Sequence, residues 1–517
     1  MSAVTTSPRP RPDDSVLAVL RSPRLLSREV LAGVVTTLAL VPEVISFSVI
    51  AGVDPMVSLV ASIVLALVMS VLGGRPAVVT AAAGSVALVI APLVHEHGVG
   101  YVLPTVLLAG LVQLAFGLGG LARLMRFVPR SVMIGFVNAL GILIFVAQVP
   151  HVLGQTWVVW PLAALTLAIV LGLPRITKAV PAPLVAIVVV TVVVAVARLD
   201  VGVVGDEGRV GGALPGLTPF SVPLTLETLQ IVWPTALSVA FVGLMESLLT
   251  AKLVDDLTDT PSHKGRESWA LGVANVAAGA WGGIAGCAMI GQTVVNVKIG
   301  RARTRVSTVA AGLFLLLLVT ALSEVMARIP MVALATVMMV VAVTTVDWHS
   351  LRPATLRRMP VPETLVMVVT VAVVVATNDL AIGVGAGVLL AMVLFARRVA
   401  HVIRVERHVE PGDAAGAGAG GAAAGGAAAV GERVRYEVRG PLFFGSSNDL
   451  VEHFAYADDP EHVVVDLTHA QVWDASSVAA LDGVVTKAAE HGTTVEFVGL
   501  DARSSGLHGR LTGRLGS

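Results

Sequence analysis

Long apolar blocks fill most of this 517-residue chain before about residue 400, and they constrain its fold more than any other feature. A transmembrane helix needs about 20 apolar residues, and many of the blocks reach that length. Only 14% of the residues are charged, whereas a soluble globular protein carries about 25%. Lipid offers no hydrogen-bond partners, so an uninterrupted apolar segment in a membrane forms a helix, in which its backbone N–H and C=O groups bond to each other. The sequence therefore predicts an all-α polytopic membrane protein. Its formal net charge of zero predicts no basic surface for nucleic acid.

About fourteen apolar blocks can be counted, and the charges between them support the count. The blocks begin near Val30, Met56, Ala77, Val102, Val132, Trp157, Val180, Ile231, Trp269, Cys287, Val306, Met331, Thr364 and Ala381. Basic residues gather after every second block, as at Arg75, Lys264, Arg303 and Arg397, and are sparse in the opposite loops. Cytoplasmic loops are enriched in Lys and Arg, so both termini are predicted to be cytoplasmic. Arginine outnumbers lysine, which indicates a bacterial genome and hence the bacterial cytoplasmic membrane.

Fourteen spans divide into two sets of seven, and a repeat with an odd number of spans inserts in opposite orientations. The sequence therefore predicts an inverted repeat, in which the first span matches the eighth and the third matches the tenth. Glu43 lies in the first span and Glu246 in the eighth. Gly84 follows Glu43 by the same number of residues, 41, as Cys287 follows Glu246. A carboxylate in a membrane span marks a candidate functional site.

The third and tenth blocks are both interrupted by small residues. They read GGRPAVVTAAAGS around Gly84 and GGIAGCAMIGQT around Cys287. Each pattern predicts an extended piece that leads into a half-helix. Two half-helix N-termini that meet near the middle of the membrane would form an anion site from backbone N–H groups and helix dipoles. The alternative is that the small residues only allow close helix packing; two such segments in matching positions favour the site.

Glu246 and Thr250 lie one helical turn apart on one face. They could bind Na⁺ together with backbone carbonyls of the tenth segment, because hard cations prefer oxygen ligands. Alternatively, Glu246 could carry a proton, or it could be a structural contact between helices. No resident cofactor is predicted, and Na⁺ enters only as a coupling ion.

Three further polar residues lie near the predicted site. Glu43 follows Pro42, so it could be functional or could satisfy a kinked backbone. Gln292 and Asn296 are one turn apart, and either could contact substrate.

The chain changes character after the last apolar block. We divide it into a cytoplasmic N-terminal segment (1–28), a transmembrane transport domain (29–408), a Gly/Ala-rich flexible linker (409–432) and a small α/β domain (433–517). The last domain has no Gly-rich phosphate loop and no nucleophile–base pair, so no enzyme is predicted.

Several motifs in order resemble those of the sulfate permease (SulP) family of anion transporters over nearly the full length. They are LALVPEVISFSVIAGVDP, GGRPAVVTAAAGS, MESLLTAKLVDDLTDT and NVAAGAWGGIAGCAMIGQTVVN, followed by a tail similar to a STAS domain. The resemblance implies fourteen spans as a seven-plus-seven inverted repeat, divided into core and gate domains. It also implies a homodimer and a STAS domain that could bind a soluble partner.

The resemblance also implies roles for individual residues. Glu246 and Thr250 match the ion-binding pair of sodium-coupled relatives, with Ala288, Met289 and Ile290 alongside. The implied substrate site comprises Phe47, Ala83, Gly84, Ser85, Ala288, Met289 and Gln292. This chain has Gln292 where many members carry arginine, and Ile290 where sodium-binding relatives have threonine.

These observations together predict a secondary transporter of a small anion such as bicarbonate, sulfate or a dicarboxylate. Transport would be coupled to Na⁺ or H⁺ and would proceed by alternating access. One alternative is a nucleobase:cation symporter of the same fold. Another is a membrane signalling protein that acts through its STAS domain.

Overall fold

The structure is a computed structural model that describes residues 15–120, 128–153, 155–176, 181–206, 208, 216–223, 225–400, 403–410 and 433–514. Residues 1–14 of the predicted N-terminal segment and 411–432 of the predicted linker lie outside these ranges. The chain forms two compact units, Met1–Val388 and Leu389–Ser517, and each is considered separately.

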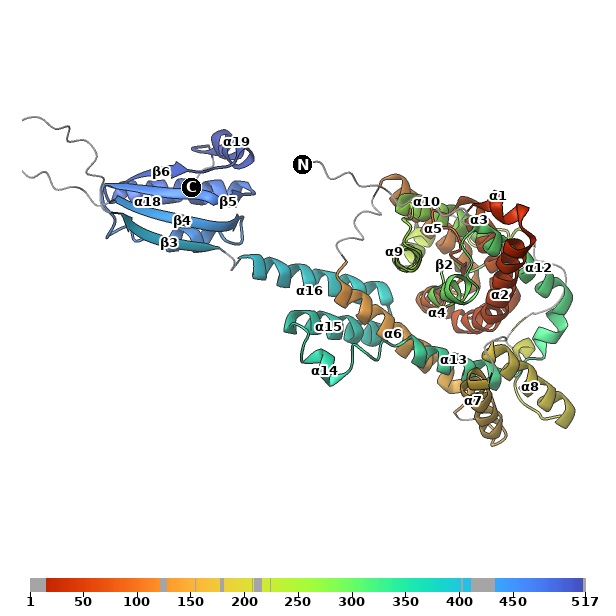
Figure 1. The fold of residues 1–517 in the computed structure, drawn as a ribbon. Coiled ribbons are helices and arrows are strands. Elements are labelled where there is room, and N and C mark those ends of the chain that lie inside the picture. The colour runs from red at the N-terminus through yellow and green to blue at the C-terminus, as the bar shows by residue number, and fades with distance from the viewer. Residues whose placement is uncertain are drawn as a thin grey trace, which may run out of the picture. The chain divides into compact units, whose positions relative to one another are not determined.

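The first unit is helical, and its described residues contain one helical segment for each predicted span (Figure 1). Eight helices are long and apolar enough to cross a membrane, and three shorter apolar helices accompany them. The segments are α2 (Pro23–Ala51), α3 (Pro55–Leu72), α4 (Gly84–His97), α5 (Val102–Leu118), α6 (Arg130–Gln148), α7 (Val159–Ile176), α8 (Ala182–Ala197), α9 (Leu226–Thr258), α10 (Lys264–Ala280), α11 (Ile290–Val294) with the π-helical η6 (Val295–Ile299), α12 (Arg305–Ala327), α13 (Met331–Thr345), α15 (Val361–Thr377) and α16 (Leu380–Ala400).

Short helices connect or precede some of these segments: α1 (Val16–Arg21), η2 (Val99–Tyr101), η4 (Val149–His151), η5 (Val204–Asp206) and α14 (Pro353–Leu356). The first long helix begins at Pro23, six residues before the predicted start of the transport domain at 29. Proline suits the first position of a helix, because its missing N–H has no intrahelical partner there.

The long helices pack in two groups. In one group α2 and α3 pack against α12, and α5 packs against α10. In the other, α6 packs against α13 and α15, while α7 packs against α8 and α13. Figure 1 shows the two groups side by side, and they correspond to the predicted core and gate.

Two three-residue strands pair antiparallel inside the first group. β1 (Thr80–Ala82) leads into α4, and β2 (Gly286–Ala288) leads into α11, with Ala81 opposite Cys287. The prediction of an extended piece before each half-helix is therefore confirmed.

The 41-residue spacing links the two segments but does not align them residue for residue. Gly84 and Ile290 are the first residues of the two half-helices, so Gly84 matches Ile290 rather than Cys287. Glycine and alanine fit both extended and helical backbone, and the sequence therefore does not mark where each strand ends.

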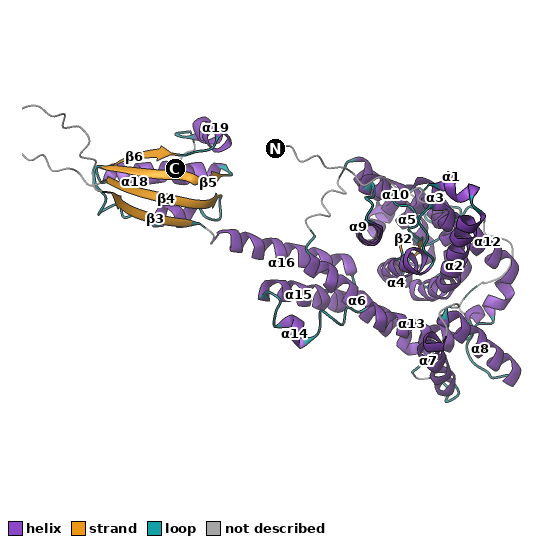
Figure 2. Ribbon diagram, in the orientation of Figure 1, coloured by secondary structure: helices purple, strands orange, loops and turns teal. Residues whose placement is uncertain are grey.

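The second unit contains a four-stranded sheet with the order β3-β4-β5-β6 (Figure 2). The strands are β3 (Arg404–Glu410), β4 (Arg433–Leu442), β5 (His462–Val472) and β6 (Thr494–Val498), and β3 is antiparallel to β4 while the others are parallel. Helices α17 (Ser447–Glu452), α18 (Ala475–Glu490) and α19 (Ala502–Leu511) complete it. Tyr436, Leu450 and Leu481 lie in its apolar core.

β3 spans the boundary predicted at 408, whereas β4 begins at Arg433, where the last domain was predicted to begin. Residues 404–410, RVERHVE, form all of β3 and pair with β4. Their alternation of polar and apolar residues is a strand pattern. The sequence alone places these residues at the end of the transport domain and the start of the linker.

Candidate functional site

The outer edges of β1 and β2 are hydrogen-bonded by side chains of the surrounding helices. Ala82 N–H donates to Ser62 Oγ (3.1 Å) and Ala288 N–H donates to Ser247 Oγ (3.0 Å). On the other side of β1, Val79 N–H donates to Thr293 Oγ1 (3.1 Å). A buried polar backbone group without a partner is costly, so these hydroxyls hold the strand pair at membrane depth.

Asn275 has a similar role at the start of β2. Its side-chain oxygen accepts from Gly286 N–H (2.8 Å), and its amide group donates to Gly286 O (3.1 Å) and to Gln113 Oε1 (2.8 Å). The sequence analysis missed Ser62, Ser247 and Thr293. Hydroxyls are common in apolar helices, and nothing in the sequence distinguishes these from others.

The two half-helices begin without a side-chain cap. Ala83 precedes α4 and Met289 precedes α11, and neither side chain accepts a hydrogen bond from the first turn. The first N–H groups of a helix have no intrahelical acceptor, and the N-terminal end carries a positive partial charge. The strand pairing brings these two ends close together, so they can attract an anion.

Phe47 and the two glycines define the space at these ends. A Cβ atom on Gly84 would lie 2.5 Å from Cε1 of Phe47, so the ring covers the start of α4. A Cβ on Gly291, the second residue of α11, would meet no atom within 4 Å. The start of α4 is therefore closely packed, and the start of α11 borders open space.

Glu246 is 6% exposed and lies against both half-helix segments. Its carboxylate accepts a hydrogen bond from the Ser85 hydroxyl in the first turn of α4. Cys287 of β2 is its other side-chain partner, and Cys287 Sγ lies 4.0 Å from Ser85 Oγ. Thr250 Oγ1 lies 2.8 Å from Glu246 O and 3.0 Å from Ala288 O.

Glu43 lies on the matching helix of the first repeat, α2, where its side chain hydrogen-bonds Gln292 of α11. Each glutamate thus contacts the half-helix of the opposite repeat: Glu246 on α9 reaches α4, and Glu43 on α2 reaches α11. This crosswise arrangement was not foreseen, because the sequence orders residues along the chain and not across it.

The structure brings most of the predicted site residues together around the strand pair. Grouped there are Phe47, Ala83, Gly84, Ser85, Glu246, Thr250, Ala288, Met289, Ile290 and Gln292. Asn296 is fully buried and donates to Ala77 O (2.9 Å) and Ser307 Oγ (3.0 Å). Its amide nitrogen thus holds the segment that leads to β1, and the substrate contact expected at Asn296 stays a prediction.

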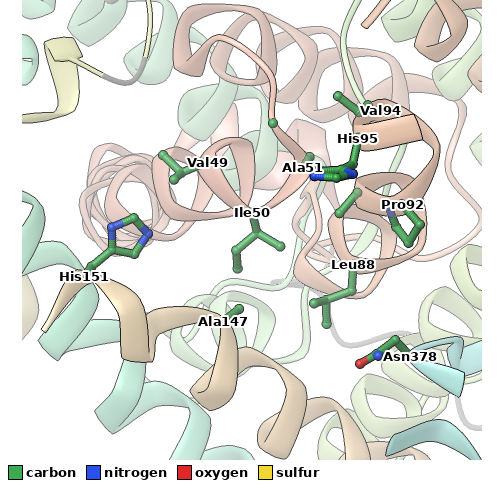
Figure 3. A pocket seen from close by; sticks show the side chains of 12 residues that line it. Val49, Ile50, Ala51, Leu88, Pro92, Val94, His95, Ala147, His151 and Asn378 are labelled. Carbon is green, nitrogen blue, oxygen red and sulfur yellow. The ribbon is translucent and has the colours of Figure 1, made fainter. Parts of the chain in front are cut away.

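A cavity of about 670 Å³ opens between the two helix groups (Figure 3). It is lined by the end of α2 and by α4 on one side, and by Ala147, His151 and Asn378 on the other. In Figure 3 the side chains of Ile50 and Leu88 lie within the lining, with His95 and His151 apart from each other. Leu88 lies one turn beyond Gly84 on α4, so the cavity extends close to the site.

Sequence comparison identifies the family. The profile of the sulfate permease family matches residues 26–160 and 155–370, and that of the STAS domain matches residues 428–505. The chain belongs to the sulfate permease family. Sulfate permease family members are transporters, so the chain is not an enzyme.

Two curated members of the sulfate permease family are similar along most of the chain. A Bacillus subtilis protein named "Putative sulfate transporter YbaR" is 46% identical over 483 residues, which are 93% of this chain and 96% of that protein. The bicarbonate transporter BicA of a Synechocystis species is 26% identical over 469 residues, which are 85% of this chain and 82% of BicA.

Solved structures agree with the fold. The transmembrane domain of a cyanobacterial bicarbonate transporter BicA has a TM-score of 0.62 at 26% identity, covering 70% of this chain and 97% of that one. Murine Slc26a9 has a TM-score of 0.77 at 15% identity, covering 94% of this chain and 87% of that one, and this likeness shows the fold alone.

Proposed function

We propose that the protein is a secondary active transporter of a small anion, driven by Na⁺ or H⁺ and working by alternating access. The observation that carries this proposal is the hydrogen bond from the Ser85 hydroxyl to the buried Glu246 carboxylate. It joins a candidate cation site to the uncapped N-terminus of a half-helix. The relatives named as sulfate and bicarbonate transporters support an anion as substrate.

The anion is proposed to bind between the starts of α4 and α11. Backbone N–H groups and two positive helix ends attract an anion without a bound metal or an arginine. Gln292 lies beside the start of α11 and presents an amide rather than a cation. Bicarbonate, sulfate and dicarboxylates all carry oxygens that accept from N–H donors.

The coupling follows from the single proton of the Ser85 hydroxyl. A hydroxyl donates one hydrogen bond at a time. While Glu246 is ionised and has no cation, Ser85 donates to its carboxylate. Once a proton or Na⁺ occupies Glu246, the hydroxyl is free to turn and donate to the anion. Anion and cation therefore favour each other's binding.

Both coupling ions suit the oxygens around Glu246. For Na⁺, the Glu246 carboxylate, the Thr250 hydroxyl and Ala288 O form a group of oxygen ligands that a hard cation prefers. A proton needs only the carboxylate. Uptake under separate gradients of the two ions distinguishes them.

Alternating access requires the site to open to each side in turn. The cavity in Figure 3 lies between the core and gate groups of helices and extends to one turn from Gly84. We propose that this cavity is the access route on the predicted extracellular side, because α2 ends there and the N-terminus is predicted to be cytoplasmic.

The test is uptake of labelled bicarbonate, sulfate and fumarate into proteoliposomes that contain the purified protein. A gradient of Na⁺ or of H⁺ is imposed alone, and one of them is expected to drive accumulation of at least one anion. Uptake that follows neither gradient would contradict coupled transport. Competition by uracil would instead favour the nucleobase alternative.

A further inference from the structure

A second, smaller cavity lies at the end of the core helices where α3 ends and α10 and α12 begin. Its volume is about 290 Å³, and four arginines line it: Arg75, Arg266, Arg303 and Arg305. The only carboxylate in its described lining is Asp259. The basic loops around it belong to the predicted cytoplasmic side.

This arginine pocket is separate from the site around Glu246. Val254 and Ala77 line it and also belong to a buried apolar cluster that contains Ala288. Along α9, Thr258 in the pocket follows Thr250 by two turns, which is about 12 Å at 1.5 Å per residue. Apolar side chains therefore lie between the two places.

Arg75 has a structural role in the pocket. Its Nε lies 3.5 Å from Asp255, and its guanidinium donates to Thr260. The nearby carboxylate of Glu267 is buried and accepts from Gly74 N–H (2.6 Å) and Arg75 N–H (3.0 Å). These contacts organise the wall of the cavity.

The other three arginines contact backbone carbonyls. Arg266 Nε donates to Leu72 O (2.8 Å), and Arg305 Nη1 donates to Ser70 O (2.8 Å). In the described part of the chain, the guanidinium of Arg303 donates only from Nη1, toward Val297 O (2.7 Å) and Ala302 O (2.8 Å).

These carbonyl contacts leave positive charge in the cavity. Within the described ranges, Arg266, Arg303 and Arg305 form no ion pair with a carboxylate. The Nε–H and Nη2 donors of Arg303 are not used by its carbonyl contacts. The arginines thus cap helix ends, and they still leave charge and donors for a ligand.

We propose that this arginine pocket binds a phosphate-class oxyanion, either free inorganic phosphate or the headgroup phosphate of an anionic lipid. Guanidinium groups match the oxygens of a phosphate with paired N–H donors. α10 starts beside the pocket without a side-chain cap at His263, so its first N–H groups add donors. This inference is independent of the coupling role proposed for Glu246.

The first experiment measures thermal unfolding of the full-length protein in detergent as sodium phosphate replaces sodium chloride at constant ionic strength. Phosphate is expected to raise the midpoint in a saturable way. Arg303→Gln should weaken the apparent affinity about tenfold or more, because a charged hydrogen-bond donor is lost. Arg303→Lys should weaken it less.

Two control variants make the result specific. Lys298→Gln removes an exposed positive charge nearby that does not line the pocket, and it should leave the phosphate response unchanged. Ser85→Ala alters the transport site and should also leave it unchanged. If Arg303→Gln does not fold, Arg266→Gln replaces it, since Arg266 is exposed. A phosphate response that survives the arginine variants, or that disappears in Ser85→Ala, would overturn the proposal.

A second experiment separates the two sources of phosphate. The protein is placed in nanodiscs of phosphatidylcholine, with or without phosphatidylglycerol, and titrated with phosphate. If an anionic headgroup occupies the pocket, phosphatidylglycerol should raise the midpoint and abolish the response to phosphate. If free phosphate is the ligand, both nanodiscs should respond equally. The absence of any arginine-dependent response to phosphate or phosphatidylglycerol would refute the site.

Discussion

The buried carboxylates of this chain fall into two classes by the partners they have. Glu267 accepts from two backbone N–H groups, and Glu29 accepts from the N–H groups of Arg303 and Thr304. Backbone N–H groups of this kind hold a carboxylate in one position. The side-chain partners of Glu246 are instead a hydroxyl and a thiol, whose hydrogens can rotate toward another acceptor. A carboxylate held in this way in an apolar helix is suited to exchange a cation.

Ser85→Ala should uncouple the anion site from Glu246. The variant removes the hydroxyl that links them, and we expect anion uptake to fall about tenfold or more, with a weaker dependence on the driving gradient. The measurement is initial uptake into proteoliposomes with and without the gradient.

Ser62→Ala provides the matched control for that variant. Ser62 accepts from Ala82 N–H, so its loss leaves a buried donor unpaired and should lower the free energy of unfolding by about 1–3 kcal/mol. The gradient dependence of transport should persist. If both serine variants behave alike, the Ser85 hydroxyl has no special part in coupling.

Glu246, Thr250 and Ser85 could be singled out from the sequence, because polar groups stand out in apolar helices and family motifs mark them. The structure groups them around the strand pair, and their roles in transport stay predictions. For Asn296 the sequence did not reveal that its amide nitrogen is already used by Ala77 and Ser307. Which of two polar residues one turn apart faces the site depends on packing that the sequence does not record.

At the scale of elements, the site depends on two short strands and the half-helices that follow them. The strands place two helix starts side by side, and hydroxyl and amide side chains satisfy their outer edges. The Gly/Ala-rich interruptions predicted these elements. Their register could not be predicted, because small residues are compatible with both strand and helix.

The two glycines at the half-helix starts should respond differently to the same change. Gly84→Ala places a methyl group against the Phe47 ring, and we expect transport to fall severely and the thermal midpoint to decrease. Gly291→Ala meets open space and should leave stability unchanged or slightly higher. Adding Phe47→Ala to Gly84→Ala should recover part of the lost stability. Equal destabilisation by both alanines would contradict this packing.

In the second unit, Asp466 on β5 should make stability depend on acid pH. Hydrogen bonds from Thr468 and Arg435 lower its pKa from 3.8 to about 2. A lowered pKa in the folded state means that the stabilisation is complete above pH 4 and is lost as pH falls toward 2. In a fragment of residues 403–517, Asp466→Asn should lower the thermal midpoint at pH 7, and the difference from wild type should shrink by pH 2.5. A difference that stays constant with pH would contradict this role.

On the scale of the whole molecule, the order of helices was predictable and the domain boundary was not. Apolar length and loop charge predicted all the membrane segments, because both are set by the bilayer. The strand β3 was missed, since it follows the last helix directly and its partner β4 lies beyond the Gly/Ala tract. Pairing between distant segments leaves no local signal.

The position of β3 predicts how the chain tolerates truncation. Ending the chain after residue 402 removes the whole sheet, whereas ending it after 432 leaves β3 without its partner. An unpaired strand edge promotes aggregation, so the chain that ends after residue 432 should be less monodisperse in gel filtration than the chain that ends after residue 402. The chain that ends after residue 402 should retain part of the anion uptake. The reverse order of behaviour would show that β3 does not need β4.

The central claim is that Glu246 carries the coupling cation, and Glu246→Gln tests it most directly. Initial uptake of the transported anion is measured in proteoliposomes, with and without the driving gradient of Na⁺ or H⁺. Glu43→Gln is the matched control, because glutamine retains a hydrogen bond with Gln292. We predict that Glu246→Gln abolishes gradient-driven accumulation and that Glu43→Gln still responds to the gradient. Accumulation by Glu246→Gln that still follows the gradient would contradict the account.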